Sequence, residues 1–204
     1  LTLSASLADG TALPSWLGFD AATRTFTGMP DDAQVGSLDL KVTATDTGNL
    51  SVSDVFTLTV TNVNEVPTVV SSLANQQATE DTAFSFTVPE STFVDVDQAH
   101  GDTLTYSASL AGGGNLPAWL SFDPLTRTFS GIPLNSEVGS MALTVTATDQ
   151  DSLSASTGFT LTIQNVNDAP TVANPFADQT VLEGAPFTIQ VPGDIFADQD
   201  LGDV

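Results

Sequence analysis

Apolar and polar residues alternate with a period of two along several short stretches of the chain. The clearest stretches are 84–88, 104–108, 143–147 and 159–163, in which every second residue is apolar. This alternation is typical of half-buried strands, and clusters of Gly, Pro, Asn and Asp mark turns between them. The pattern predicts seven strands, near 68–72, 83–88, 103–109, 118–122, 126–130, 139–148 and 156–165. Because no helical periodicity competes, we expect an all-β fold, an antiparallel two-sheet sandwich.

The pattern occurs twice. "LPSWLGFDAATRTFTGMP", which contains Trp16, returns as "LPAWLSFDPLTRTFSGIP", which contains Trp119, at an offset of 103 residues. With this offset, 39 of the first 66 positions are identical without a gap, so the chain contains a duplication. A period of about 100 residues is the size of one immunoglobulin-type sandwich domain.

The repeat predicts three parts of the chain, divided at the segments "TNVNEVP" and "QNVNDAP". Residues 67–169 are expected to be one complete repeat, 1–66 the C-terminal two-thirds of a repeat, and 170–204 the N-terminal third of another. The final "GDV" joined to the initial "LTLSAS" reproduces the internal "GDTLTYSAS". We therefore expect a window on a longer tandem array, in which residues 1–66 are not a finished sandwich.

Composition narrows the class of partner. Three Lys and Arg residues stand against 25 Asp and Glu residues, and the net charge is -22. Such a chain cannot neutralise phosphates, which argues against nucleic acid as a partner. The acidic surface is explained either by solubility in a salty medium or by bound divalent cations that relieve the repulsion. Cysteine is absent, which excludes disulfides and a thiol nucleophile, and no apolar run is long enough for a membrane span.

The combination of "LPAWLSFDPLTRTFSGIP" with "FTLTIQNVNDAP" resembles the dystroglycan-type cadherin-like repeats, also named immunoglobulin-like repeats, of large bacterial surface and secreted proteins. The resemblance covers the whole chain in repeated form. It implies a cadherin-like sandwich with Ca²⁺ at the junctions between repeats. It also implies an extracellular or cell-surface location.

The cadherin resemblance assigns oxygen ligands to two junctions. The first would combine Asn62, Asn64 and Glu65 with Asp95, Asp97 and Asp149. The second would combine Glu80 with Asn165, Asn167, Asp168, Asp198 and Asp200. Asp46 and Glu183 would serve further junctions. The aspartate-arginine-glutamate motif of cadherins is missing, which leaves the number of ions per junction open.

The chemistry of these residues fits calcium, which takes six to eight oxygen ligands from carboxylates, amides and carbonyl groups. The alternative is structural, because Asn, Asp and Pro also form ordinary turns, and "NVNDAP" could be a rigid bend alone. The run that begins at Asp95 is not an EF-hand, because its twelfth position is Tyr106 where a glutamate is required.

Two other functions can be weighed on the sequence. The recurring Trp16 and Trp119 could stack on a sugar, but each lies next to alternating apolar residues, which favours core or edge packing. An enzyme is not supported, since the single histidine, His100, lies in a turn where we expect it to be solvated, and no nucleophile-base pair is visible.

The sequence therefore predicts a non-enzymatic, calcium-stiffened structural repeat of a bacterial extracellular stalk, adhesin or filament. Its partners would be neighbouring repeats of the same protein, other copies in a fibre, or a polysaccharide or cell-surface ligand. The alternative function is a polysaccharide-binding module of a secreted protein.

Overall fold

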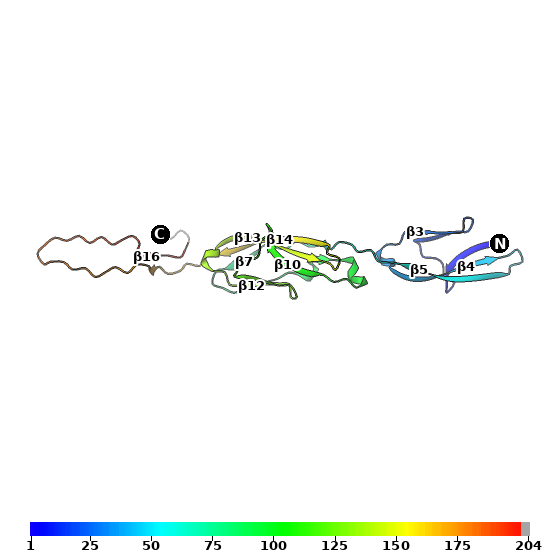
Figure 1. Ribbon diagram of the computed structural model, residues 1–204, viewed down its shortest axis with the longest axis horizontal. Coiled ribbons are helices and arrows are strands. Elements are labelled where there is room, and N and C mark those ends of the chain that lie inside the picture. The colour runs from blue at the N-terminus through cyan, green and yellow to red at the C-terminus, as the bar shows by residue number, and fades with distance from the viewer. Residues whose placement is uncertain (201–204) are drawn as a thin grey trace. The chain divides into compact units, whose positions relative to one another are not determined.

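The computed structural model describes residues 1–200, and these form two compact units (Figure 1). Unit 1 contains Leu1–Thr68, Val94–Leu104 and Thr148–Ser154. Unit 2 contains Val69–Phe93, Thr105–Ala147 and the described residues from Ala155 on. The C-terminal "GDV", which we aligned with the stretch before Leu104, lies outside the described residues.

Unit 1 is built from an antiparallel sheet and a hairpin. Its strands are β1 (Thr2–Leu7), β2 (Leu17–Asp20), β3 (Thr25–Gly28), β4 (Gly36–Thr45) and β5 (Ser51–Val60). The sheet has the order β1-β4-β5, while β2 and β3 pair with each other. The ring of Phe26 on β3 lies 5.6 Å from that of Phe56 on β5, so the hairpin packs against one face of the sheet. Leu40, on the central strand, is fully buried.

Unit 1 is not a finished sandwich. Among the described residues, β5 pairs only with β4, and β3 pairs only with β2. Phe56 on β5 is 41% exposed, whereas its counterpart Phe159 in unit 2 is 5% exposed. The domain limits 1–66, 67–169 and 170–204 stay a prediction.

Unit 2 contains two sheets. Its main strands are β7 (Gln76–Thr79), β8 (Phe84–Thr87), β10 (Thr105–Leu110), β11 (Leu120–Asp123), β12 (Thr128–Gly131), β13 (Gly139–Thr148) and β14 (Ser154–Gln164). One sheet has the order β10-β13-β14-β7 and the other β11-β12-β8.

The two sheets of unit 2 meet at a cluster of aromatic rings. The ring of Phe159 on β14 lies 5.1 Å from Phe86 on β8 and 5.5 Å from Phe129 on β12, with both pairs in edge-on geometry. Phe129 is completely buried, as are Leu143 and Leu161. The alternation seen in the sequence thus places one apolar face of each sheet in a common core.

The sandwich predicted from the sequence is confirmed, and most of the predicted strands are present. The structure adds β7, which the alternation did not show because in "QQAT" only Ala78 is apolar and buried. β7 pairs parallel with β14, from Leu161 opposite Gln76 to Gln164 opposite Thr79. The sandwich therefore contains one parallel pair within an otherwise antiparallel arrangement.

Short elements complete the described chain. The two-residue strands β6 (Thr68–Val69) and β9 (Phe93–Val94) pair with each other, as do β15 (Thr171–Val172) and β16 (Phe196–Ala197). The 3₁₀ segments are η1 (Asp32–Gln34), η2 (Glu90–Thr92), η3 (Val96–His100) and η4 (Asn135–Glu137). Within residues 1–200, no helix has the length and apolar character required to cross a membrane.

Candidate metal centre

Asp97 holds the segment that follows β5. One carboxylate oxygen accepts a hydrogen bond from the side-chain amide of Asn62 at 2.7 Å, and the other accepts from the backbone N–H of Glu65 at 2.6 Å. Asp97 is almost fully buried. These contacts keep its pKa below the ordinary value, chiefly through the N–H of Glu65 and then the amide of Asn62.

Asp97 is positioned by η3. Asp95 caps this 3₁₀ segment, because its Oδ1 accepts the N–H of Asp97 at 2.9 Å. Gly101 ends the segment with a φ of 102°, a left-handed conformation that favours glycine. The turn at Gly101 places Asp102 directly after the 3₁₀ segment. The stretch "DVDQAHGD" therefore contributes the carboxylates of Asp95, Asp97 and Asp102 to the candidate centre.

Asp149 approaches from the end of β13. Its Oδ1 accepts the N–H of Leu153 at 2.7 Å, which closes the turn into β14. Its Oδ2 accepts the side-chain amide of Asn64 at 2.9 Å. Asp102 is held beside it, since its Oδ1 accepts the N–H of Gln150 at 3.2 Å.

The six residues predicted for the first junction are therefore joined through direct contacts, and two further carboxylates complete the cluster. Within the part of the chain that the structure describes, two groups of three carboxylates have oxygen atoms within 4.8 Å of one another. These groups are Asp32 with Glu65 and Asp97, and Asp95 with Asp102 and Asp149. We refer to the six carboxylate residues of these two groups, together with Asn62 and Asn64, as the first centre.

Asp32 and Asp102 were missed by the sequence analysis. Asp32 starts η1 behind a capping box formed by Asp31 and Gln34, and the 103-residue offset places an oxygen-bearing residue, Asn135, at the same position of the next repeat. An oxygen-bearing side chain at the same position of both repeats is a signal from which Asp32 could have been predicted as a ligand. Asp102 follows Asp97 by five residues, and only the left-handed turn at Gly101 brings it to the cluster.

His100 is another correction. We expected it to be a solvated turn residue, but its Nε2 lies 2.9 Å from Oδ1 of Asp32, and its side chain is about one-fifth exposed. His100 therefore contacts the edge of the first centre. When protonated, it would be the cation nearest to Asp32 among the described residues.

The first centre carries unrelieved negative charge. Burial raises the pKa of Asp95, and the charges of Asp102, Asp97 and Asp149 raise it further, although the N–H of Asp97 opposes them. Asp95 Oδ2 and Asp102 Oδ2 are buried without a hydrogen-bond partner. A buried carboxylate oxygen without a hydrogen-bond donor destabilises the folded state. A bound cation would offset the charge of these carboxylates.

The residues of the first centre fit calcium. They offer carboxylate and amide oxygens from four separate segments, and no nitrogen or sulfur ligand other than the peripheral His100. Calcium prefers such all-oxygen sets, whereas zinc favours Cys and His. Each Asn also has an amide oxygen that can replace its nitrogen as the group facing the cluster.

The residues predicted for the second junction repeat several of these contacts. Asn165 donates its side-chain amide to Asp200 Oδ1 at 3.1 Å, and the N–H of Asp168 donates to Asp200 Oδ2 at 2.7 Å. Asp198 Oδ1 accepts the N–H of Asp200 at 2.9 Å. Asn167 donates to the carbonyl oxygen of Asp168 at 3.0 Å, as Asn64 does to that of Glu65 at 3.3 Å. We refer to these residues, with Glu80, as the second centre.

The side chain of Glu80 contacts the linker of the second centre through the backbone N–H of Val166. Its Oε1 accepts the N–H of Val166, and its Oε2 is buried without a partner. The parallel pairing of β7 with β14 positions it, because β7 ends at Thr79 directly before it and the N–H of Glu80 donates to Gln164 at 3.1 Å. Asn135 adds a side-chain contact to Asp168 at 3.4 Å. The coordination of one ion by Glu80 together with Asp198 and Asp200 stays a prediction.

The surroundings of Trp119 bear on the alternative of sugar stacking. It is half-buried, and its indole N–H is buried without a hydrogen-bond partner. A Cβ on Gly131 would lie 3.0 Å from the Trp119 ring and 2.0 Å from its carbonyl oxygen. The absence of a side chain at Gly131 therefore allows the chain around Trp119 to lie against β12, which agrees with edge packing.

Comparison with curated proteins finds animal and bacterial relatives. Cadherin-17 of Mus musculus is 36% identical over 119 residues, which cover 56% of this chain and 14% of that protein. The serine-rich adhesin for platelets of Staphylococcus aureus (strain MRSA252) is 29% identical over 149 residues, 73% of this chain and 10% of the adhesin. The chain thus spans a small part of the length of the curated relatives it matches.

Solved structures support the fold. Mouse cadherin-23 EC22-24 matches with a TM-score of 0.55 and 19% identity, over 81% of this chain and 53% of that one. Extracellular cadherin domains 1-4 of protocadherin gamma B7 match with a TM-score of 0.52 and 18% identity, over 88% and 46%. At these identities the likeness shows an immunoglobulin/cadherin-like β-sandwich and no more.

A family model described as "Putative Ig domain" matches residues 1–61 and again residues 66–164. The two matches together cover more than half of the chain and recur at the spacing of the internal repeat. The cadherin and adhesin relatives are consistent with this repeat type in surface proteins. The chain therefore belongs to the "Putative Ig domain" family of cadherin-like repeats.

Proposed function

We propose that this chain is a non-enzymatic, calcium-stiffened structural segment of a bacterial extracellular stalk, adhesin or filament. Its likeness to cadherins and to a staphylococcal adhesin supports a structural module of the adhesion type. The staphylococcal relative supports a bacterial surface setting, and we extend that setting to this chain as part of the proposal.

The observation that carries the proposal is the first centre. Asp95 Oδ2 and Asp102 Oδ2 are buried without a donor, in a cluster whose six carboxylates come from segments far apart in the sequence. Calcium, when bound, supplies the positive charge that offsets this crowding. A rigid bend made of Asn and Pro alone would not require buried carboxylates without partners.

The residues of the first centre would stiffen the segment that follows β5. Asp97 and Asp149 already restrain Asn62, Asn64 and Glu65 through hydrogen bonds. With a cation present, the repulsion among the carboxylates would no longer oppose these contacts. Extracellular calcium modules bind at about 10⁻⁴ to 10⁻³ M, so the segment would become stiff at extracellular calcium concentrations.

The proposed location is therefore extracellular. The proposed partners are neighbouring repeats of the same protein, other copies in a fibre, and a cell-surface or polysaccharide ligand. The predicted domain limits, 1–66, 67–169 and 170–204, belong to this proposal, with the linkers "TNVNEVP" and "QNVNDAP" as the calcium-dependent joints.

The test is an isothermal titration of the chain with calcium, combined with small-angle scattering in calcium and in chelator. We expect binding near millimolar concentrations and a narrower distribution of particle dimensions with calcium. Asp97→Asn should remove binding at the first centre, and Asp54→Asn, at an exposed carboxylate whose Oδ1 accepts only the adjacent N–H of Val55, is the matched control. Absence of heat and an unchanged scattering profile would reject calcium and leave the linker as a bend.

A further inference from the structure

Two asparagines of the linker that follows β5 contact aspartates of the first centre. The side-chain amide of Asn62 donates to Asp97 Oδ1 at 2.7 Å, and the side-chain amide of Asn64 donates to Asp149 Oδ2 at 2.9 Å. An ionised carboxylate only accepts hydrogen bonds, so each amide presents its nitrogen and not its oxygen to the aspartate. We refer to these two hydrogen bonds as the asparagine contacts.

The asparagine contacts complete the hydrogen bonding of two buried carboxylates. The second oxygen of Asp97 accepts the N–H of Glu65 at 2.6 Å, and the second oxygen of Asp149 accepts the N–H of Leu153 at 2.7 Å. Asp97 is 1% exposed and Asp149 is 5% exposed, so their donors must come from the protein. The linker supplies three of these four donors, and only the N–H of Leu153 comes from outside it.

The other carboxylates of the first centre are less well supplied. Oδ2 of Asp95 and Oδ2 of Asp102 are buried without a hydrogen-bond partner. The available donors are therefore concentrated on Asp97 and Asp149. An amide that faces a carboxylate with its nitrogen does not offer its oxygen to a cation there, so a cation that binds Asp97 and Asp149 has to compete with the asparagine contacts.

The first of the asparagine contacts occurs again in the second centre. Asn165 donates to Asp200 Oδ1 at 3.1 Å, and the N–H of Asp168 donates to Asp200 Oδ2 at 2.7 Å. The amide donor and the backbone donor thus both recur at the 103-residue offset. The combination is a feature of the repeat and does not belong to one linker alone.

We propose that Asn62 and Asn64 are positioning residues with two effects: they order the linker when no cation is bound, and they weaken calcium binding by occupying Asp97 and Asp149. Hydrogen bonds to an ionised carboxylate are stronger than those between neutral groups, which suits both effects. An aspartate in place of either asparagine would reverse them, because a carboxylate has no donor and adds an anionic ligand. The second effect rests on the proposed calcium site, whereas the first needs no cation.

NMR relaxation of the full chain in chelator tests the first effect. The backbone N–H of Glu65 is the reporter, because it donates to Asp97 beside Asn62. We expect an order parameter of about 0.85, typical of a rigid backbone, in the wild type, and a value below about 0.6 in Asn62→Ala and in Asn62→Asp. Asn115→Asp, at an exposed loop residue, is the matched control for the added charge and should keep the wild-type value.

The N–H of Leu153 is the internal reference for this measurement. It donates to Asp149 from the turn into β14 and not from the linker. Its order parameter should stay at the rigid value in all of these variants. A loss of order at Glu65 alone then reports on the linker and not on unfolding of the centre.

Calcium titration tests the second effect. Asn62→Asp should bind calcium roughly tenfold more tightly than the wild type, because a hydrogen bond to a charged group no longer competes and an anionic ligand is gained. Asn115→Asp adds the same negative charge away from the centre and should leave the dissociation constant unchanged. The comparison separates a local effect at the linker from the effect of net charge.

Several results would overturn the proposal. A Glu65 amide that is flexible in the wild type in chelator, or equally rigid in Asn62→Ala, would overturn the first effect. A dissociation constant of Asn62→Asp that is equal to or weaker than that of the wild type would overturn the second. Absence of calcium binding in every variant would overturn the second effect together with the proposed function, and the order parameters would still decide the first.

Discussion

The side-chain amide of Asn62 lies 2.7 Å from Oδ1 of Asp97, although 35 residues separate them in the sequence. The same relationship recurs between Asn165 and Asp200, also 35 residues apart, at 3.1 Å. In each pair the second oxygen of the aspartate accepts a backbone N–H three residues beyond the asparagine, from Glu65 or from Asp168. The duplication has therefore kept the same two hydrogen bonds between the linker and the aspartate 35 residues after its first asparagine.

Calcium should stabilise the chain through these contacts. At a free calcium concentration of about 100 times the dissociation constant, one site that binds only the folded state adds roughly 2.7 kcal/mol to the free energy of unfolding. We expect Asp97→Asn to reduce the calcium-dependent rise in melting temperature and Asp54→Asn to leave it unchanged. The measurement is thermal unfolding in calcium and in chelator, and an equal rise in both variants would contradict a role for Asp97.

Glu80→Gln should have opposite effects with and without calcium. The glutamine keeps an acceptor for the N–H of Val166 but removes the charge from a side chain whose Oε2 is buried without a partner. In chelator we expect the variant to be more stable than the wild type by roughly 1 kcal/mol. In saturating calcium the order should reverse, since an anionic ligand is lost. Denaturant unfolding under both conditions measures the reversal, and a variant that is less stable in chelator too would disprove it.

Asp95 should make the calcium-free protein less stable as the pH rises. Burial and the neighbouring carboxylates raise its pKa in the folded state above the value of about 3.9 of an unfolded chain. The folded state then binds the proton more strongly, so this contribution to stability is present at low pH and is lost as the pH rises through the raised pKa.

The variant Asp95→Asn isolates this contribution from those of the other carboxylates. In chelator, the stability of the wild type relative to Asp95→Asn should fall as the pH rises above about 4. Asp97 has a lowered pKa and contributes in the opposite direction, but its effect is expected in both proteins. Unfolding curves across this pH range provide the measurement, and a constant difference between the two proteins would refute the assignment.

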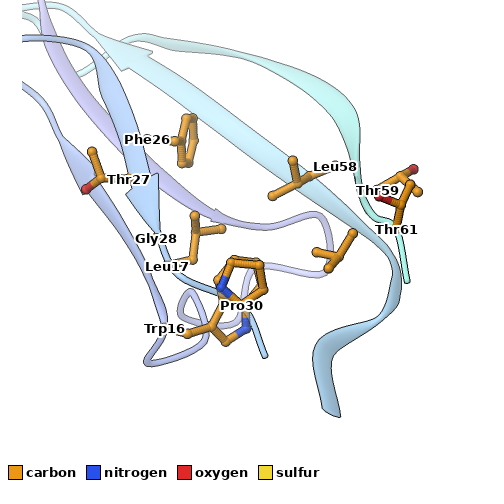
Figure 2. A pocket seen from close by; sticks show the side chains of 10 residues that line it. Trp16, Leu17, Phe26, Thr27, Gly28, Pro30, Leu58, Thr59 and Thr61 are labelled. Atoms are coloured by element: carbon orange, nitrogen blue, oxygen red, sulfur yellow. The ribbon is translucent and has the colours of Figure 1, made fainter. Parts of the chain in front are cut away.

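Phe129→Ala should cost more than Phe26→Ala. Phe129 is fully buried among Phe86, Phe122 and Phe159, and loss of such a side chain costs about 3–5 kcal/mol. Its counterpart Phe26 (Figure 2) is only half-buried, so we expect about half of that cost. Chemical denaturation of the two variants compares the losses of stability. Equal losses would contradict the difference in burial between the two rings.

The fold was largely predictable because its signals are local. Alternating apolar residues identify strands such as 143–147 and 159–163, and the 103-residue repeat identifies the sandwich as a unit that occurs more than once. β7 was not predictable in this way. It is held by parallel pairing with β14 and by the burial of Ala78, and a polar stretch with one small apolar residue carries no periodic signal.

The same division applies to the candidate centre. The sequence by itself determined the duplication, the oxygen-rich linkers and the paired aspartates Asp95 and Asp97, because each is a short motif that recurs in phase. Only the folded chain shows that Asp32 and Asp102 join them and that His100 lies against Asp32. These relationships depend on turns and strand pairing that bring distant segments together, and spacing along the chain does not encode such distances.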